Sequence, residues 1–351
     1  MKINLVSGFL GSGKTTAIER ACRELLVAGV RVGVITNDQG ERLVDGDFFE
    51  SLGIPNRQVK NGCFCCNYNQ LDDSIHSLLE VTRPAVIFAE AVGSCTDMVA
   101  TVMKPLLLYR DDVSVTVSVL TDVRVLYMQL RHNTLLFDES VNYIYFKQLE
   151  EAGIIVVNKI DLIDAGQLAD IRRVMQQKYP DKIILYQDSF AEGGVGPWME
   201  ALACPAELSS LEIDYAIYGA GEALLAWLDQ EVSVVSPDGR AGLAAIALTR
   251  RIDERIRECE YPIGHLKFLL DGKTKISYTA LAAEEAGGVT VDAAAESATL
   301  LINARVQTGP VILAGLVAAA IGEIAAQYGC TLVTKKCASF QPGFPKPTHR
   351  R

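Results

Sequence analysis

The sequence predicts an α/β domain with a mostly parallel sheet, followed by a smaller α+β domain. In the first half of the chain, short and continuous apolar segments alternate with helical patterns, which is typical of parallel strands covered on both faces. A glycine-rich segment, residues 8–16, directly follows the first apolar segment, and a second motif, residues 158–161, follows a later one. Because parallel strands place their carboxyl ends at one edge of a sheet, we expect both motifs at that edge.

The elements of the α/β domain are expected from this alternation. The first helix, for example, places Ala17, Ile18, Cys22 and Leu25 at helical spacing. Strands are predicted at residues 2–7, 32–36, 84–89, 113–120, 153–157 and 182–186. Helices are predicted between them, at residues 15–28, 71–81, 122–130, 143–151 and 165–178.

A change in composition near residues 203–214 indicates a domain boundary, so we expect domains at residues 1–212 and 213–351. The order of elements in the second domain resembles a split β-α-β layout. Its strands are predicted at residues 225–235, 265–271, 275–280, 298–307 and 330–335, and its helices at 241–259 and 311–328. Residues 341–351 hold three prolines and several basic residues, which predicts a flexible tail.

Composition excludes several classes of protein. The 351 residues are 49% hydrophobic, which is enough for large cores, and the net charge of −10 argues against a nucleic-acid-binding surface. Nothing resembles a signal peptide, and the most apolar run, residues 311–321, is too short for a membrane span. The chain has nine cysteines, which without a secretory signal favour reduced thiols and a cytoplasmic location.

The segment at residues 8–16 matches the pattern G-x-x-x-x-G-K-[ST] without a mismatch. Its glycines allow backbone N–H groups to surround a phosphate at the start of a helix, where the helix dipole also favours an anion. Lys14 should reach the β- and γ-phosphates, and Thr15 should hold Mg²⁺. The motif therefore predicts nucleoside triphosphate binding rather than a plain strand-to-helix turn, through Gly8, Gly11, Ser12, Gly13, Lys14, Thr15 and Thr16.

The motif N-K-x-D, formed by Asn158, Lys159 and Asp161, follows the strand predicted at residues 153–157. An Asp carboxylate can accept hydrogen bonds from N1–H and the exocyclic amine of guanine, and adenine offers no matching pair of donors. Downstream of a phosphate-binding loop, the motif therefore predicts GTP as the nucleotide. The alternative is a strand cap followed by the start of a helix.

Cys63, Cys65 and Cys66 lie within four consecutive residues, next to Gly62. In an extended chain Cys63 and Cys65 face one way and Cys66 the other, so the backbone must turn for the three sulfurs to converge. Three thiolates suit Zn²⁺ and can also take Co²⁺ or Ni²⁺, with the fourth ligand left open. The alternatives are a loop with incidental thiols or a redox-active dithiol.

Two carboxylates follow strands of the same sheet. Glu90 ends one apolar strand and is followed by Gly93, and Asp38 follows the preceding strand. At such positions a carboxylate can contact Mg²⁺ or respond to the γ-phosphate, so Glu90 and Asp38 join Lys14 as candidate catalytic residues. The alternative for each is a helix or turn cap.

Together these motifs resemble the CobW-type GTPases, relatives of UreG and HypB. The shared features are the loop at residues 8–16, the G-C-x-C-C cluster at 62–66, E-x-x-G at 90–93 and N-K-x-D at 158–161, in this order. The resemblance covers roughly residues 1–190. It implies a P-loop GTPase domain with a metal site near its switch segments, and a role in metal delivery or cofactor assembly.

We therefore expect a GTPase with slow basal hydrolysis and a transition-metal site, acting as a metallochaperone or an assembly factor. Its partners would be a client metalloprotein or a cofactor-assembly enzyme, and a homodimer could form through metal and nucleotide. The alternatives are a GTP-dependent regulatory switch, a P-loop ATPase or kinase with structural cysteines, and a thiol-redox protein.

Overall fold

The computed structural model describes residues 1–38, 40, 44–131, 136–204, 206–281 and 295–351. The chain forms two compact units, and each is built from segments that are not contiguous in sequence. Unit 1 comprises Met1–Gln39, Leu52–Gly221 and Phe344–Arg351, and unit 2 comprises Gly40–Ser51 and Glu222–Gly343. The main division between these units falls at Gly221, and the domain bounds at residues 212 and 213 stay a prediction.

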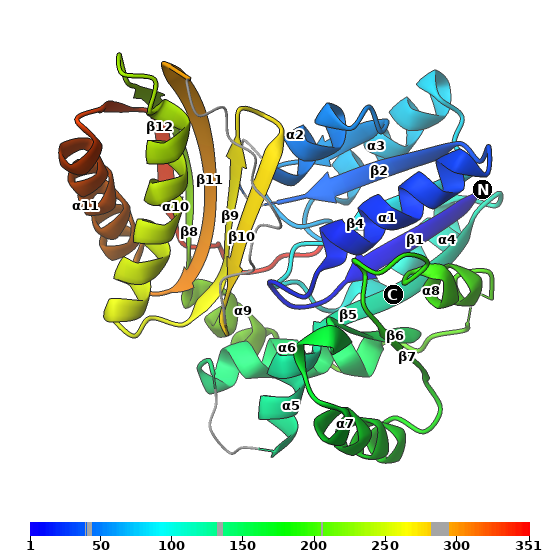
Figure 1. The fold of residues 1–351 in the computed structure, drawn as a ribbon. Helices are drawn as coiled ribbons and strands as arrows, with labels where there is room; N and C mark the ends of the chain where they lie inside the picture. Colours follow the sequence, from blue (N-terminus) through cyan, green and yellow to red (C-terminus); the bar gives the residue numbers. More distant parts are fainter. Residues whose placement is uncertain (39, 41–43, 132–135, 205, 282–294) are drawn as a thin grey trace. The chain divides into compact units, whose positions relative to one another are not determined.

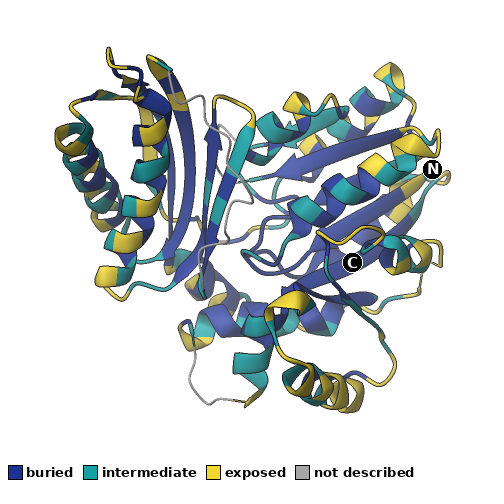
Figure 2. Cartoon of the chain, in the orientation of Figure 1, coloured by how far each residue is buried: buried dark blue, intermediate teal, exposed yellow. Residues whose placement is uncertain are grey.

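Unit 1 contains a seven-stranded parallel sheet in the order β3-β2-β4-β1-β5-β6-β7, which confirms the predicted α/β class (Figure 1). The strands are β1 (Lys2–Ser7), β2 (Val32–Asn37), β3 (Asn56–Val59), β4 (Val86–Glu90), β5 (Ser114–Asp122), β6 (Ile154–Asn158) and β7 (Ile183–Gln187). β1, β2 and β6 are buried along almost their whole length, as continuous apolar strands of a covered sheet should be (Figure 2).

Most helices of unit 1 lie between its strands in sequence, and the last two follow β7. They are α1 (Lys14–Val27), α3 (Tyr68–Val81), α4 (Lys104–Tyr109), α5 (Val123–Arg131), α6 (Glu139–Glu151), α7 (Ala165–Lys178), α8 (Gly196–Ala201) and α9 (Tyr215–Ala223). A π-helical turn, Val99–Met103, precedes α4, and a 3₁₀ turn, Ile160–Leu162, follows β6. Asp164 begins α7 with a capping box, in which its side chain and that of Gln167 each accept a hydrogen bond from the other's backbone N–H.

Unit 2 contains a five-stranded antiparallel sheet in the order β10-β9-β11-β8-β12. Its elements are α2 (Val44–Ser51), β8 (Leu225–Val235), α10 (Ala241–Glu258), β9 (Ile263–Leu270), β10 (Thr274–Thr279), β11 (Ser297–Gln307), α11 (Pro310–Tyr328) and β12 (Thr331–Phe340). Apolar residues of α10 and α11, among them Leu248 and Val317, share one core with Leu228, Phe268 and Ile302 of the sheet. This agrees with the predicted smaller α+β domain.

The apolar run near residue 311 is longer than predicted. α11 extends over Pro310–Tyr328 and, by length and composition alone, is long and apolar enough to cross a membrane, so the expectation that the run is too short was wrong. The run continues because Ile324 and the two alanines after it keep the hydropathy high. Leu313, Val317 and Ile324 pack into the core of unit 2, and 22% of the most apolar window of the helix is buried.

The segment Gly40–Ser51 follows β2 of unit 1 but is part of unit 2. Val44 packs with Leu269 and Leu301, and its N–H donates to Asn303 Oδ1 at 2.8 Å. Asp45 pairs with Lys267 and, at 2.7 Å, with Lys275. Burial alone would raise the pKa of Asp45, but these two ammonium groups hold it well below its usual range.

Two buried polar residues of α6 hold the segment that follows β4. Gln148 Nε2 donates to the carbonyls of Gly93 and Cys95, at 3.0 and 2.7 Å. Glu151 accepts hydrogen bonds from Thr96 Oγ1 at 3.1 Å and from the Val99 N–H at 3.4 Å. Burial raises the pKa of Glu151 to about 8.

We expect this buried carboxyl to make stability depend on pH. The pKa of Glu151 is about 8 in the folded protein against an ordinary 4.5, so between these values the folded state holds a proton that the unfolded state releases. The free energy of unfolding should therefore fall by up to about 1.4 kcal/mol per pH unit from pH ~5 to ~8 because of this group. Glu151→Gln should lose that slope, as measured by urea unfolding across this range.

Glu150→Gln, which changes a neighbouring and partly exposed carboxylate of the same helix, serves as the control. A stability difference between wild type and Glu151→Gln that stays constant from pH 5 to pH 8.5 would contradict the prediction.

Candidate nucleotide and metal site

The loop between β1 and α1 has a backbone that requires glycine at two positions. Gly8 has φ +129°, and a Cβ there would lie 2.0 Å from the carbonyl oxygen of Leu120. Gly13 has φ +91°, and a Cβ there would lie 2.4 Å from Asn158 Nδ2. The loop is therefore packed against the ends of β5 and β6 with no room for side chains at these points.

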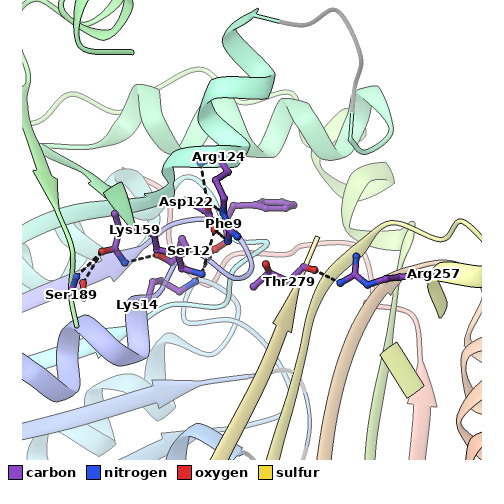
Figure 3. A network of polar contacts seen from close by, with 10 residues as sticks. Phe9, Ser12, Lys14, Asp122, Arg124, Lys159, Ser189, Arg257 and Thr279 are labelled. Carbon is purple, nitrogen blue, oxygen red and sulfur yellow. Dashed lines mark hydrogen bonds and ion pairs between the residues drawn. The ribbon is translucent and has the colours of Figure 1, made fainter. Parts of the chain in front are cut away.

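Lys14 and Thr15 open α1 and are both buried. Lys14 Nζ donates to the carbonyls of Gly8 and Phe9, at 2.6 and 3.3 Å, so the ammonium group is held within the loop (Figure 3). Gly11 and Thr16 are half-buried, and Ser12 is buried. The predicted phosphate-binding residues thus lie together in one loop and the first turn of one helix.

Thr15 and Glu90 meet at the same edge of the sheet. Thr15 Oγ1 donates to Glu90 Oε1 at 2.9 Å, and each residue is only 4% exposed. A hydroxyl and a carboxylate next to a phosphate-binding loop are the kinds of oxygen ligand that Mg²⁺ takes. Asp38 lies at the end of β2, where its N–H donates to the carbonyl of Val59, and its catalytic role stays a prediction.

The N-K-x-D residues divide into a buried pair and an exposed carboxylate. Asn158 Nδ2 donates to the carbonyl of Ser12 at 3.0 Å, and Asn158 Oδ1 accepts from Ser189 Oγ at 2.8 Å. Lys159 Nζ lies 3.3 Å from Asp122 Oδ2 (Figure 3). Asp161 is exposed, so its carboxylate is accessible to a ligand. The buried pair ties the phosphate-binding loop to β5, β6 and β7.

Ser189 was not among the residues predicted from the sequence. It follows β7 directly after Gln187 and Asp188, at the same edge of the sheet as the predicted motifs. Its position after a strand is its one sequence signal, and Ser189 belongs to none of the recognised motifs.

The cysteine cluster forms a tight turn before α3. The carbonyl of Cys63 accepts from the N–H groups of Cys66 and Asn67, at 3.1 and 2.9 Å, which confirms that the backbone turns. The sulfurs of Cys63 and Cys65 lie 2.7 Å apart, those of Cys65 and Cys66 lie 3.8 Å apart, and all three lie within 4.8 Å of one another. Zinc–sulfur bonds of about 2.3 Å in a tetrahedron separate two sulfurs by about 3.8 Å, so this set fits a zinc ion after small displacements.

Asn37, at the end of β2, holds this turn from both sides. Its Nδ2 donates to the carbonyl of Gly62 at 2.7 Å, and its Oδ1 accepts from the N–H of Phe64 at 2.8 Å. The side chain of one strand residue therefore fixes the backbone on either side of Cys63. This role was not predicted from the sequence, because it depends on contacts between segments that are 25 and 27 residues apart.

The three thiols of the turn differ in acidity. Hydrogen bonds from neighbouring thiols hold the pKa of Cys63 well below its usual range, whereas the pKa of Cys65 is raised because it acts as a donor to Cys63. The pKa of Cys66 is raised to about 11, chiefly by its hydrogen bond to Cys63. A cation that binds all three sulfurs as thiolates must displace the protons that these thiols carry.

The C-terminal segment lies on this turn instead of forming the predicted flexible tail. The N–H of Lys346 donates to Cys66 Sγ at 3.3 Å, and the N–H of Thr348 donates to the carbonyl of Cys65 at 2.8 Å. Arg350 Nε donates to the buried Asp97 at 2.8 Å. Prolines limit the conformational freedom lost on ordering, and the ion pair with a buried carboxylate adds a specific contact, which explains why the segment is ordered.

Comparison with known proteins places these features in a family. The model of the CobW/HypB/UreG nucleotide-binding domain matches residues 2–185. Zinc chaperone CobW from Sinorhizobium sp is 28% identical over 192 residues, which cover 48% of this chain and 53% of that protein. Zinc chaperone YeiR from Escherichia coli (strain K12) is 29% identical over 198 residues, covering 53% of this chain and 55% of that protein.

Zinc chaperone YjiA from the same Escherichia coli strain is 34% identical over 98 residues, which cover 27% of this chain and 30% of that protein. The chain thus spans about half the length, or less, of these curated relatives. The segment matched by the family model covers more than half of the 351 residues, and the chain therefore belongs to the CobW/HypB/UreG family of nucleotide-binding domains.

Proposed function

We propose that this protein binds and hydrolyses GTP, and that it uses the nucleotide cycle to carry Zn²⁺ to a client metalloprotein or cofactor-assembly enzyme in the cytoplasm. The proposal rests on one observation. The last residues of two neighbouring strands hold the cysteine turn and contact the nucleotide loop. Asn37 of β2 holds the turn, and Glu90 of β4 accepts from Thr15 of the loop. β2 and β4 are paired directly, with Thr36 opposite Glu90.

Hydrolysis would proceed by positioning and electrostatic stabilisation. The loop amides and Lys14 would neutralise charge that develops on the γ-phosphoryl group, and Glu90 or Asp38 would orient the attacking water. When bound, Mg²⁺ supplies further neutralisation of the phosphate oxygens, with Thr15 as its protein ligand. Asp161 would select guanine.

Zn²⁺ is the cargo in this proposal, with Co²⁺ or Ni²⁺ as possible replacements. Cys63, Cys65 and Cys66 would hold it as thiolates, and three curated relatives are named zinc chaperones. Two copies of the chain would form a homodimer through the metal ion and the nucleotide. Neither a regulatory switch nor a P-loop ATPase with structural cysteines would require the three sulfurs to gather as they do here.

Guanine selectivity is expected to depend on Asp161. Asp161→Ala should weaken GTP binding by about 10- to 100-fold, because two donors of guanine would lose their acceptor. Asp161→Asn should shift preference toward xanthine nucleotides, whose acceptor at this position suits an amide donor. Fluorescent-nucleotide titration measures both effects, and Asp181→Asn, at another exposed carboxylate of unit 1, is the control. Equal affinity of the wild-type protein for ATP and GTP would rule out the proposed selection of guanine by Asp161.

Lys14→Ala should reduce GTP hydrolysis by at least about 100-fold, because the charge that stabilises the transferring phosphoryl group is removed. Phosphate release under single-turnover conditions measures this effect, and circular dichroism verifies the fold. Lys273→Ala, at an exposed lysine of unit 2, is the control. A folded Lys14→Ala protein with unchanged turnover would show that the loop does not act as proposed.

Metal affinity is expected to change with the nucleotide. Zn²⁺ should bind with a dissociation constant that differs by about 5- to 150-fold between the protein with a GTP analogue and with GDP, and linkage requires the same factor for the effect of Zn²⁺ on nucleotide affinity. Cys65→Ala should lose tight Zn²⁺ binding, whereas Cys259→Ala, at an exposed cysteine of unit 2, should keep it. Competition with a chromophoric chelator measures these affinities. Identical affinity in both nucleotide states would favour a GTPase switch with no carrier role.

A further inference from the structure

The segment after β4 forms a tight turn that lies on the phosphate-binding loop. The N–H of Cys95 donates to the carbonyl of Val92 at 3.0 Å, so Gly93 is the second residue of a β-turn. A Cβ on Gly93 would lie 3.0 Å from the backbone nitrogen of Leu10 and 2.6 Å from Cδ2 of the same residue. The backbone of Gly93 therefore approaches the loop more closely than a residue with a side chain could without displacing Leu10.

Helix α6 holds this turn through the side-chain amide of Gln148. Its Nε2 donates to the carbonyl of Gly93 at 3.0 Å and to that of Cys95 at 2.7 Å. A side-chain amide nitrogen carries two N–H donors, and here two carbonyls of one turn accept from them. Gln148 is 1% exposed, so water does not compete for these hydrogen bonds.

Other contacts fix the segment before and after the turn. Before it, Glu90 accepts from Thr15 Oγ1 at 2.9 Å. After it, Thr96 Oγ1 donates to Glu151, which lies one helical turn beyond Gln148 on α6, at 3.1 Å. Of the two α6 side chains, Gln148 is the one that contacts the residue lying against the loop.

The place of Gly93 bears on the response of the protein to the nucleotide. In a phosphate-binding loop, backbone amides surround the β- and γ-phosphates. Because GDP lacks the γ-phosphate, a backbone segment packed on this loop can contact the outermost phosphate of GTP and has no counterpart to contact in GDP. GTPases commonly use such a segment as a switch that the γ-phosphate orders, and ordering it in advance lowers the entropy cost of the contact.

We propose that Gln148 is a positioning residue for the γ-phosphate of GTP. It holds Gly93 against the loop, where the backbone of Gly93 contacts the γ-phosphate and helps to align GTP for hydrolysis. The inference rests on the proposed binding and hydrolysis of GTP and adds a residue that acts through Gly93 without touching the nucleotide. Without the two donors of Gln148 the turn would gain conformational freedom, and part of the binding free energy of GTP would be lost in ordering it.

The test uses the full chain with Gln148→Met, which keeps the length of the side chain and removes both donors. Affinity for a non-hydrolysable GTP analogue should fall about 10-fold, as expected for the loss of two hydrogen bonds that order the turn, while GDP affinity should stay within about twofold of the wild type. Turnover at saturating GTP should also fall by about 10-fold, because the bound γ-phosphate is no longer aligned. Fluorescent-nucleotide titration and phosphate release measure these effects.

Gln129→Met is the matched control. Gln129 is a half-buried glutamine of α5 whose Nε2 donates to Asn142 Oδ1 of α6, so this change removes the same kind of donor from the same unit without affecting the turn. It should match the wild type in all three measurements. If Gln148→Met does not fold, as judged by circular dichroism, Gln148→Asn replaces it. The amide of Asn is too short to reach both carbonyls, so the same loss specific to GTP is expected.

The outcomes separate this inference from the proposed function. Wild-type values in the Gln148 variant, or an equal loss of affinity for the GTP analogue and for GDP, would overturn the inference and leave Gln148 as a structural contact of the domain. A wild-type protein that neither binds nor hydrolyses GTP would instead overturn the proposed function on which the inference rests.

Discussion

Parallel strand pairing fixes where the polar residues of unit 1 can meet. Val6 of β1 lies opposite Glu90 of β4, and Asp122 of β5 lies opposite Asn158 of β6. Because all seven strands run in one direction, each strand ends at the same edge, where its last side chains leave the apolar core. The nucleotide loop, the N-K-x-D motif, the carboxylate of Glu90 at the end of β4 and the cysteine turn all follow from this alignment.

The sequence could predict most strands and helices of both units because their apolar spacing is regular, as in β1 and α1. It could not predict β3, whose residues Asn56–Val59 are mostly polar and half-buried at the edge of the sheet. The candidate site was predictable where a motif is contiguous, as in residues 8–16. Asn37 and Ser189 were missed because each acts through contacts with distant segments, which a single sequence does not display.

Several buried charges of unit 1 have a partner of opposite charge. Asp122 is buried and accepts from Arg124 while it lies near Lys159, and Asp97 accepts from Tyr215 and Arg350. Among the residues that the structure describes, Glu151 forms no ion pair. Burial raises its pKa to about 8, so this carboxyl keeps its proton near neutral pH. Asp97 and Glu151 lie in or contact the segment after β4, and Asp122 is the last residue of β5. The charges near the candidate site are therefore set by residues from several elements of unit 1.

The exchange of segments between the two units has a consequence for synthesis. Residues 344–351 cover the cysteine turn in unit 1, yet they are made only after all of residues 222–343. During translation, the sulfurs are thus present in a nascent chain long before the segment that covers them. A fragment that ends at Gly221 would keep this uncovered state permanently, and it would also present Val44 and Asp45 without the strands that bury and neutralise them.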